Sequence, residues 1–412
     1  MRGILLSYLF IASISASVCF AEFQINTRTS NNQANPAIAM DANGNFMIVW
    51  SSYFTGDRSN EIFGQRFDPN CTPVGGEFQI NTTTTGNQTE SSIAMNAVGS
   101  FVVAWQGPGI DEEDIFIQQF DPNGQPLDYE LLVNSYIQGR QRYPKVAMNR
   151  DGVFVVVWES EKAKAGTTVV SCQLFDVNGL AVGEEFDVDA PADCRYPDVA
   201  MDPNGNFAIV WMQDENKNSI RGRLYDANGT AETELFEVST INFSSVTRPS
   251  IAMDANGYFV VTWDGDPNKA GLDDIHARLF DPNGTALGEQ FTVNTTLAEA
   301  QQYPQVSMNN KGEFVIVWET EIEAHTTERD IFGQRFDSLG QPVGDEFLIN
   351  TYVEGDQRYP DIALGENGVF VTVWQSDEQD GSGYGIFGEM NSIADSIEVP
   401  SYNVVEAQEH NQ

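Results

Sequence analysis

The stretch Phe154-Val-Val-Val-Trp158 (FVVVW) decides the fold, because six close copies of it recur along the chain. The copies are FMIVW (46–50), FVVAW (101–105), FAIVW (207–211), FVVTW (259–263), FVIVW (314–318) and FVTVW (370–374). Their tryptophans are 52 to 56 residues apart, and a repeat of this size indicates a propeller, a solenoid or an array. Each copy is apolar at consecutive positions, which predicts a strand that is covered on both faces.

Each repeat divides into four short strands separated by turn residues. Turns such as Asp-Ala-Asn-Gly (41–44) separate the first strand from the second, and turns such as Asp-Pro-Asn-Gly (281–284) separate the third from the fourth. Asp bonds to its own backbone and Asn-Gly accepts a positive φ, so both turns predict tight hairpins. Four antiparallel strands in this order form one blade of a propeller.

The order of the strands predicts a closed ring. The fourth-strand pattern FQIN occurs at residues 23–26, before any first strand, and the last repeat ends after its third strand near residue 390. Residues 22–27 are therefore expected to pair with the strand near residues 384–390, which removes two exposed sheet edges. We predict an all-β, seven-bladed propeller over residues 22–390, with an open array as the alternative.

Both ends of the chain lack the repeat. Residues 1–21 carry one Arg, an apolar run and a small-residue exit, which predicts a secretory signal peptide cleaved after Ala21. The apolar run is too short for a membrane anchor. Residues 391–412 are predicted to form a flexible tail. We expect a secreted, periplasmic or cell-surface protein without membrane insertion.

The charge balance excludes one class of partner. The chain has 60 acidic and 21 basic residues, a net charge of −39, which repels nucleic acid and attracts cations. Acidic residues gather in the loops after the second strands, and carboxylates of this kind suit Ca²⁺. No EF-hand spacing is present, so solvated acidic loops are the alternative. The candidate Ca²⁺ ligands are Asp111, Asp114, Asp264, Asp266, Asp273, Asp274, Asp377 and Asp380.

Three cysteines remain after removal of the signal peptide. Cys172 lies in the third strand of the third repeat and Cys194 in the segment that leads to the fourth, so a disulfide between them is expected to join neighbouring blades. Cys71 is expected to be an exposed spare thiol.

A second recurring element precedes the first strand of most repeats. Tyr and Arg around a channel mouth could bind a sugar, a carboxylated polymer or a peptide. Alternatively, each Tyr fills the seam between two blades and Pro starts the strand. Repeats one and two have Asn35-Pro36 and Ser91-Ser92 instead. The predicted ligand-binding residues are Arg142, Tyr143, Arg195, Tyr196, Arg248, Tyr303, Arg358 and Tyr359.

Catalytic motifs are not evident. His276 and His325 lie in unrelated places, and neither a Gly-x-Ser-x-Gly elbow nor an HExxH motif occurs. A pair of carboxylates could still hydrolyse a glycosidic bond, since glycosidases need only two at a suitable separation.

The run IFGQRFD at residues 331–337, followed by GQPVG (340–344) and EFLINT (346–351), resembles a repeat widespread in large secreted or surface bacterial proteins. The same run occurs at residues 62–68. The resemblance covers residues 22 to about 390 and implies a β-propeller. It implies no catalytic residue, because the family is largely uncharacterised.

Function is expected on one face of the predicted disc. The loops between second and third strands share a face with the loops that join successive blades, and both are dissimilar among repeats. We predict a non-catalytic binding or scaffold module for a glycan, peptide or protein partner. The alternatives are a carbohydrate-active enzyme, either a glycoside hydrolase or a polysaccharide lyase, at the channel mouth, and a structural envelope component.

Overall fold

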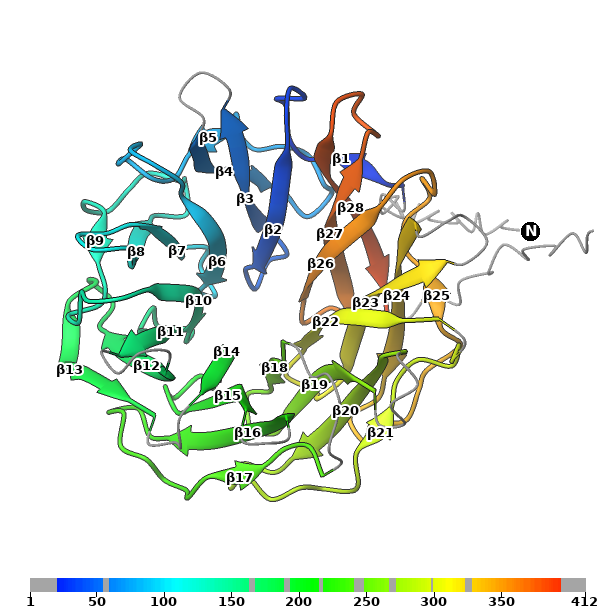
Figure 1. Cartoon of the computed structure of the whole chain (residues 1–412). Coiled ribbons are helices and arrows are strands. Elements are labelled where there is room, and N and C mark those ends of the chain that lie inside the picture. Colours follow the sequence, from blue (N-terminus) through cyan, green and yellow to red (C-terminus); the bar gives the residue numbers. More distant parts are fainter. Residues whose placement is uncertain are drawn as a thin grey trace, which may run out of the picture.

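The computed structural model describes residues 21–54, 59–162, 167–188, 193–214, 218–240, 248–266, 272–297, 299–322 and 328–393. These residues form 28 strands and no helix, and the strands make seven four-stranded antiparallel sheets around one axis (Figure 1). The predicted all-β, seven-bladed propeller is confirmed. Residues 1–20 of the predicted signal peptide and residues 394–412 of the predicted tail lie outside the described residues.

The first four blades follow the chain, each with its first strand nearest the axis. Blade 1 consists of β2 (Gln33–Met40), β3 (Phe46–Phe54), β4 (Ser59–Phe67) and β5 (Phe78–Gln79). Blade 2 consists of β6 (Thr89–Met95), β7 (Phe101–Pro108), β8 (Glu113–Phe120) and β9 (Leu131–Leu132). Blade 3 consists of β10 (Gln141–Met148), β11 (Phe154–Lys162), β12 (Thr167–Phe175) and β13 (Ala181–Asp187). Blade 4 consists of β14 (Cys194–Met201), β15 (Phe207–Asp214), β16 (Asn218–Tyr225) and β17 (Phe236–Glu237).

The last three blades complete the ring. Blade 5 consists of β18 (Ser250–Met253), β19 (Phe259–Gly265), β20 (Asp274–Phe280) and β21 (Phe291–Thr292). Blade 6 consists of β22 (Gln301–Met308), β23 (Phe314–Ile322), β24 (Glu328–Phe336) and β25 (Phe347–Leu348). Blade 7 consists of β26 (Gln357–Leu364), β27 (Val369–Asp377), β28 (Tyr384–Ser392) and the N-terminal strand β1 (Phe23–Gln24).

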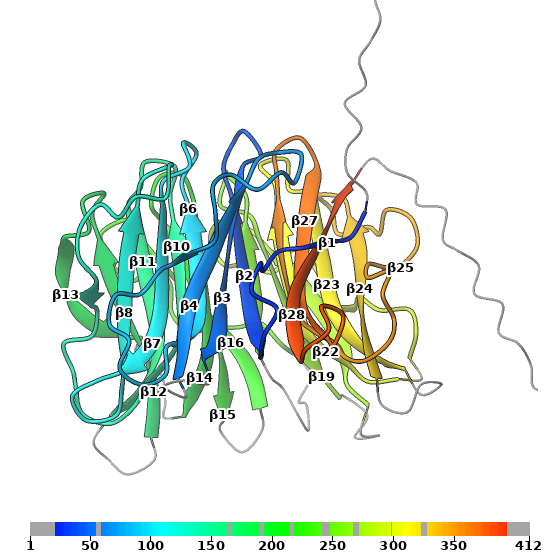
Figure 2. The same ribbon diagram turned by 90° about the horizontal axis from the view of Figure 1, so that it is seen from above.

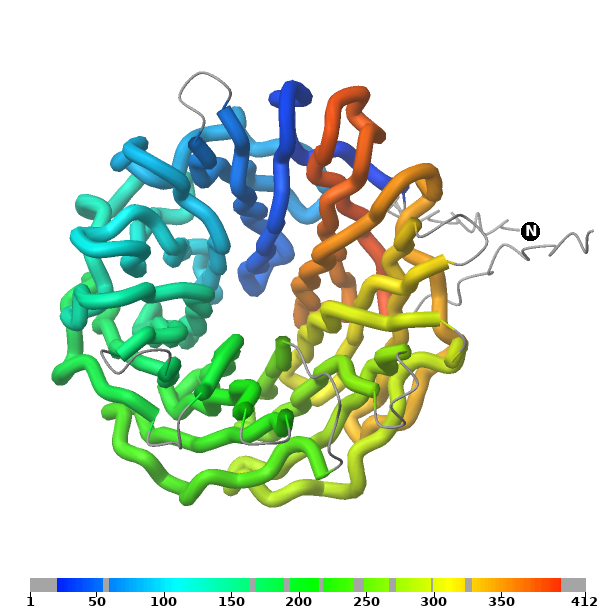
Figure 3. Tube along the Cα trace, viewed as in Figure 1, coloured from blue at the N-terminus to red at the C-terminus, as the bar shows by residue number. Residues whose placement is uncertain are grey.

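The N-terminal strand closes the ring. β1 pairs antiparallel with β28, with Phe23 opposite Gly388. The Ile25 N–H then donates to the Ile386 carbonyl at 2.8 Å. Figure 3 shows the first described residues, in blue, beside the orange and red strands of the last blade. The predicted pairing of the two chain ends is confirmed.

Asp carboxylates build the tight hairpins. Asp41 Oδ1 accepts the N–H groups of Asn43 and Asn45, both at 2.8 Å, and Gly44 has a φ of 83°. These hairpins lie on one side of the disc, which we call the hairpin face. The connections from second to third strands and from blade to blade lie on the other side, the loop face (Figure 2). No helix in the described part of the chain is long and apolar enough to cross a membrane.

The core lies in the seams between blades. Seven apolar clusters each join two neighbouring blades, and the seven repeat tryptophans are fully buried in them. The indole N–H of Trp158 donates to Gln141 Oε1, at the start of the first strand, at 3.0 Å. Blades 2, 6 and 7 repeat this bond. In these four blades the buried indole N–H is thereby satisfied within its own blade.

At the rim, a carboxylate of one blade binds the backbone of the preceding one. Glu130 Oε2 of blade 2 accepts the N–H of Thr82 at 2.8 Å and its hydroxyl at 3.0 Å. Gln290 does the same for Thr240 at 2.8 and 3.0 Å. We call these contacts rim staples. Equivalent staples are made by Glu22, Glu77, Glu185 and Glu346.

Candidate binding site at the channel mouth

One residue near the start of each first strand stands at a special backbone position. In six blades the register of the first two strands shifts there, and the residue has a positive φ of 50° to 54°. Residues other than glycine rarely adopt this conformation, and such strain clusters at functional sites. The residues are Asn35, Glu90, Tyr143, Tyr196, Tyr303 and Tyr359, with Arg248 at the aligned position of blade 5. We call these seven residues the mouth ring.

The residue after the repeat tryptophan holds these positions in place. Its side chain accepts the N–H of the mouth-ring residue on the next blade. Gln106 Oε1 accepts the Tyr143 N–H at 3.0 Å, and Glu159 Oε1 accepts the Tyr196 N–H at 2.5 Å. Glu319 and Gln375 make the same bond to blades 7 and 1. At these four positions the strained backbone is therefore fixed by the neighbouring blade.

Four tyrosines of the mouth ring form two pairs. The rings of Tyr143 and Tyr196 are 5.1 Å apart and meet edge to face at 62°. The rings of Tyr303 and Tyr359 are 5.0 Å apart and meet at 66°. Edge-to-face contact is a favoured arrangement for aromatic rings. The pairs span the seams between blades 3 and 4 and between blades 6 and 7, so they lie on either side of blade 5.

Arg248 of blade 5 lies between the two pairs. Its guanidinium carbon is 5.1 Å from the ring centres of both Tyr143 and Tyr196 and 5.8 Å from that of Tyr303. Its Nη1 is 3.8 Å from a Glu90 carboxylate oxygen of blade 2. Burial lowers the pKa of Arg248, but the Glu90 charge and the tyrosines outweigh burial and leave the pKa raised. A cation beside aromatic rings thus reaches across the mouth from blade 5 to blade 2.

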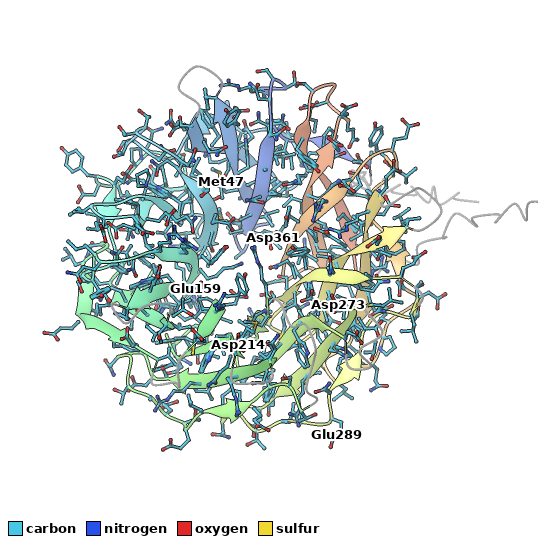
Figure 4. The ribbon with its side chains drawn as sticks, viewed as in Figure 1. Met47, Glu159, Asp214, Asp273, Glu289 and Asp361 are labelled. Atoms are coloured by element: carbon cyan, nitrogen blue, oxygen red, sulfur yellow. The ribbon has the colours of Figure 1, made fainter. Side chains whose placement is uncertain are left out.

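The mouth ring lines a cavity of about 130 Å³. Lys145 and Asp361 contribute charged groups to its wall, and Figure 4 shows Asp361 beside the axis, with Glu159 farther out in blade 3. The Asp361 carboxyl accepts the N–H groups of Ile38 and Ile362, both at 2.9 Å, and so joins blade 7 to blade 1. Burial raises its pKa to about 6, against the lowering effect of Lys145.

The ionisable groups around the ring are tuned by burial. Burial raises the pKa of the Tyr143 and Tyr303 hydroxyls, so both stay neutral at physiological pH. Burial also raises the pKa of Glu159 and Glu319 to about 7. The site therefore offers neutral phenols, aromatic faces and one firmly charged guanidinium, a set of groups suited to binding.

The structure separates the predicted ligand-binding residues into two groups. Tyr143, Tyr196, Arg248, Tyr303 and Tyr359 line the cavity together. The other three arginines lie outside this lining. Arg142 Nε is 3.4 Å from a Glu113 oxygen, and Arg358 Nε is 3.6 Å from a Glu319 oxygen. The charge of Arg195 lowers the pKa of Glu159, against the larger effect of burial.

Several predicted Ca²⁺ ligands support the blades. Asp114 Oδ1 accepts the side-chain amide of Asn134 at 2.7 Å, and Asp274 Oδ1 accepts that of Asn294 at 2.9 Å. Asp380 accepts the amide of Asn26 at 3.2 Å. In each case the Asn follows a fourth strand, so Asp114 of β8 and Asp274 of β20 tie the third strand to the segment after the fourth, and Asp380 does so from the loop before β28.

The remaining acidic candidates are dispersed. Asp111 accepts the Gly139 N–H at 3.3 Å, and Asp273 accepts the Gln302 side chain at 3.1 Å. Burial and then Glu378 raise the pKa of Asp377, while Asp264 and Asp266 are buried. Among the residues that the structure describes, no group of three His, Cys, Asp or Glu side chains could hold a metal ion. A Ca²⁺ site stays a prediction.

The predicted Cys172–Cys194 disulfide is wrong in this structure. Neither cysteine is in a disulfide, and both are buried in one apolar cluster. Cys172 lies opposite Val157, one residue before the tryptophan, whereas Cys194 lies opposite Gln213, two residues after the equivalent tryptophan. This offset of three residues is about 10 Å along the strand direction, beyond the reach of a disulfide. Cys71 is partly exposed and is in no disulfide.

Sequence reasoning missed part of the ring. The bulge aligns Glu90, one residue before the Ser91-Ser92 pair, with the tyrosines. Sequence reasoning also missed the carboxylates Glu159 and Glu319. A usable signal was present, since Gln or Glu follows the tryptophan in four of the seven repeats.

No family model and no curated protein match the sequence. Solved structures match by fold. A protein of unknown function from Dyadobacter fermentans has a TM-score of 0.56 and 11% identity, over 90% of this chain and 98% of its own. The polysaccharide lyase Uly1 has a TM-score of 0.55 and 10% identity, over 87% and 90%. A Penicillium chrysogenum α-L-arabinanase complexed with arabinobiose has a TM-score of 0.50 and 11% identity, over 74% and 93%. At these identities the likeness shows the fold alone.

Proposed function

We propose that this chain is a secreted, non-catalytic binding module whose loop face holds a glycan, peptide or protein partner over the mouth ring. The observation that carries the proposal is the reach of Arg248 across the channel mouth, from blade 5 to Glu90 of blade 2. The cavity that the mouth ring lines measures about 130 Å³, below the roughly 300–1,000 Å³ of ordinary ligand pockets. A partner would therefore rest on the mouth instead of entering the channel.

Rigidity supports this role. Four of the strained mouth-ring N–H groups are bound by side chains of the neighbouring blade. Aromatic side chains that are already fixed lose little conformational freedom when a partner binds, so more of the contact energy is retained as affinity. Around this fixed centre the acidic loops would supply contacts specific to the partner, with or without Ca²⁺. A structural envelope role would use the same disc as an assembly unit.

The second candidate is a carbohydrate-active enzyme. Glu159 and Glu319, with pKa values raised to about 7, have the acidity that suits a general acid. Propellers of similar fold include a polysaccharide lyase and an arabinanase. However, the two residues are only 6% and 1% exposed, and both carboxylates hold a backbone N–H. Binding therefore accounts better for the geometry.

A glycan array and a pull-down with the purified protein, each with and without a chelator, test the proposal. We expect a retained partner, and we expect the Tyr143→Ala/Tyr303→Ala double variant to lose it. Tyr258→Ala is the matched control, because Tyr258 is 44% exposed on the hairpin face. Loss of binding only with the chelator would support Ca²⁺. Absence of any retained partner in all conditions would refute the proposal.

A screen on polysaccharides separates the two candidates. Turnover that disappears in both Glu159→Gln and Glu319→Gln, but persists in Glu161→Gln on the same strand as Glu159, would favour the enzyme. We expect no turnover by the wild-type protein.

A further inference from the structure

Arg248 occupies the place where four other blades carry tyrosine. Three tyrosine rings surround its guanidinium at 5.1 to 5.8 Å, and the Glu90 carboxylate approaches from across the ring at 3.8 Å. Several aromatic faces beside one carboxylate are the arrangement by which proteins bind organic cations. Here the protein's own side chain fills the cage.

The hold on this side chain is light. Its contacts are a long ion pair with Glu90, at 3.8 Å, and the faces of three tyrosine rings. The strand β18, which begins two residues later, is tied to blade 6, because Ser250 Oγ accepts the Val306 N–H at 3.3 Å. The guanidinium can therefore leave the cage by side-chain rotation, with the strand unchanged.

We propose that the mouth ring is a cation-binding cage that takes an arginine side chain of a peptide partner, and that Arg248 is its built-in occupant. The inference rests on the proposed binding role of the loop face and names the partner's chemistry. Displacement of Arg248 would expose Tyr143, Tyr196 and Tyr303 to the incoming guanidinium, while Glu90 pairs with its charge.

The charge of the whole molecule fits a cationic partner. The chain has 60 acidic and 21 basic residues, so its field draws cationic peptides toward it. Acidic side chains also lie on the loop face, such as Glu112 between β7 and β8 and Glu113 at the start of β8. A carboxylated polymer would meet repulsion from the same field.

The occupant lowers the apparent affinity. A ligand that needs an empty cage binds only the fraction of molecules in which Arg248 has moved away, and its apparent Kd rises by the inverse of that fraction. Removal of Arg248 should therefore strengthen binding of an external guanidinium. Deletion of any arginine also makes the net charge more negative and so favours cation binding in general. A control variant that loses a different arginine measures this general effect.

The test uses the full mature chain as wild type, Arg248→Ala and the control Arg140→Ala, at about 0.15 M salt. Arg140 is another loop-face arginine, paired with Glu112, so its loss changes the net charge equally. N-acetyl-arginine amide is titrated by calorimetry, and the neutral N-acetyl-citrulline amide serves as the isosteric probe. We expect Arg248→Ala to bind the arginine probe at least about tenfold more tightly than wild type and Arg140→Ala, with no binding of the citrulline probe.

A second pair of variants tests whether Glu90 and Tyr143 form the binding site for the arginine probe. Arg248→Ala combined with Glu90→Gln or with Tyr143→Ala should lose most of the gained affinity. If Arg248→Ala folds poorly, Arg248→Gln replaces it, with the same expectation. Equal affinity of wild type and both Arg248 variants would overturn the cage, and so would equal gains in Arg248→Ala and Arg140→Ala. Binding of an array glycan by wild type alongside that result would leave the proposed binding role intact.

Discussion

At the residue scale, the position after the repeat tryptophan makes the same hydrogen bond with an amide in some blades and with a carboxyl group in others. The residue after the repeat tryptophan accepts the N–H of a strained mouth-ring residue through Gln106 and Gln375 in two seams and through Glu159 and Glu319 in two others. The amides are neutral at every pH. The carboxyls are buried, so burial keeps them protonated to a higher pH than usual.

The pH dependence of the unfolding free energy should show the ionisation of the Glu159 carboxyl group. Its pKa rises from 4.5 in the unfolded chain to about 7 in the folded protein. Its stabilising contribution is therefore present below pH 4.5 and is lost as the pH rises through about 7. Glu159→Gln keeps the acceptor for Tyr196, so it should avoid this loss. We expect its unfolding free energy to gain roughly 1–3 kcal/mol on wild type across that range, measured by urea unfolding.

Glu161→Gln, two residues further along β11, removes one charge without touching the mouth ring and is the control. A pH profile of Glu159→Gln parallel to that of wild type would mean that Glu159 is ionised in the folded protein throughout this range.

At the element scale, the first and second strands of a blade are joined by side chains that recur with the sequence repeat. The tryptophan of the second strand bonds to the glutamine that opens the first strand, as Trp158 does to Gln141. The bond fixes the level at which the first strand enters, two residues before the mouth-ring position. Packing within a blade thereby sets the height of the tyrosines around the axis.

Gln141→Ala should destabilise the protein by about 2–4 kcal/mol, because it leaves a buried indole N–H without its acceptor and opens a cavity. Urea unfolding followed by tryptophan fluorescence measures the change. Gln138→Ala, in the exposed loop before the strand, should cost less than about 0.5 kcal/mol. Equal costs for both would show that the Trp158 bond contributes nothing.

The rim staples offer a natural comparison of Glu with Gln. Glu130→Ala removes the acceptor for the Thr82 N–H and hydroxyl, and we expect a cost of about 1–2 kcal/mol together with faster amide exchange at Thr82. Glu130→Gln should cost less than half as much, since Gln290 makes the same contacts in blade 5. A Gln variant as unstable as the Ala variant would show that the negative charge, not the hydrogen bonding, holds the seam.

At the scale of the whole molecule, the fold depends on a strand borrowed from the other end of the chain. Ile25 follows β1 and Ile80 follows β5, and the two side chains fill matching places in the core. Each is 2% exposed. The closing seam is therefore packed like an internal one, although its partners are about 360 residues apart in sequence.

Ile25→Ala and Ile80→Ala form a matched pair for ring closure. Both should lower the unfolding free energy by about 2–4 kcal/mol, because each removes the same buried methyl and methylene groups. Denaturant unfolding of the two variants side by side measures this. A cost for Ile25→Ala well below that of Ile80→Ala would mean that β1 does not close the ring in solution.

The sequence by itself determined the number of blades, the four strands of each and the closure by residues 22–27. These follow from local chemistry, namely turn residues, consecutive apolar positions and a strand missing from the last repeat. The pattern is easy to recognise because it recurs in seven repeats. It also singled out the tyrosines and Arg248 as unusual. Such features act over a few residues, so the order of amino acids is enough to specify them.

Only the tertiary structure decided which of those residues meet. It brings Arg248 of blade 5 against Glu90 of blade 2, turns Arg142 and Arg358 toward carboxylates, and sets Cys172 and Cys194 at different heights. These relations depend on the radius of the ring and on the register between strands. Both are fixed by packing across seams, between residues that no short stretch of sequence contains together.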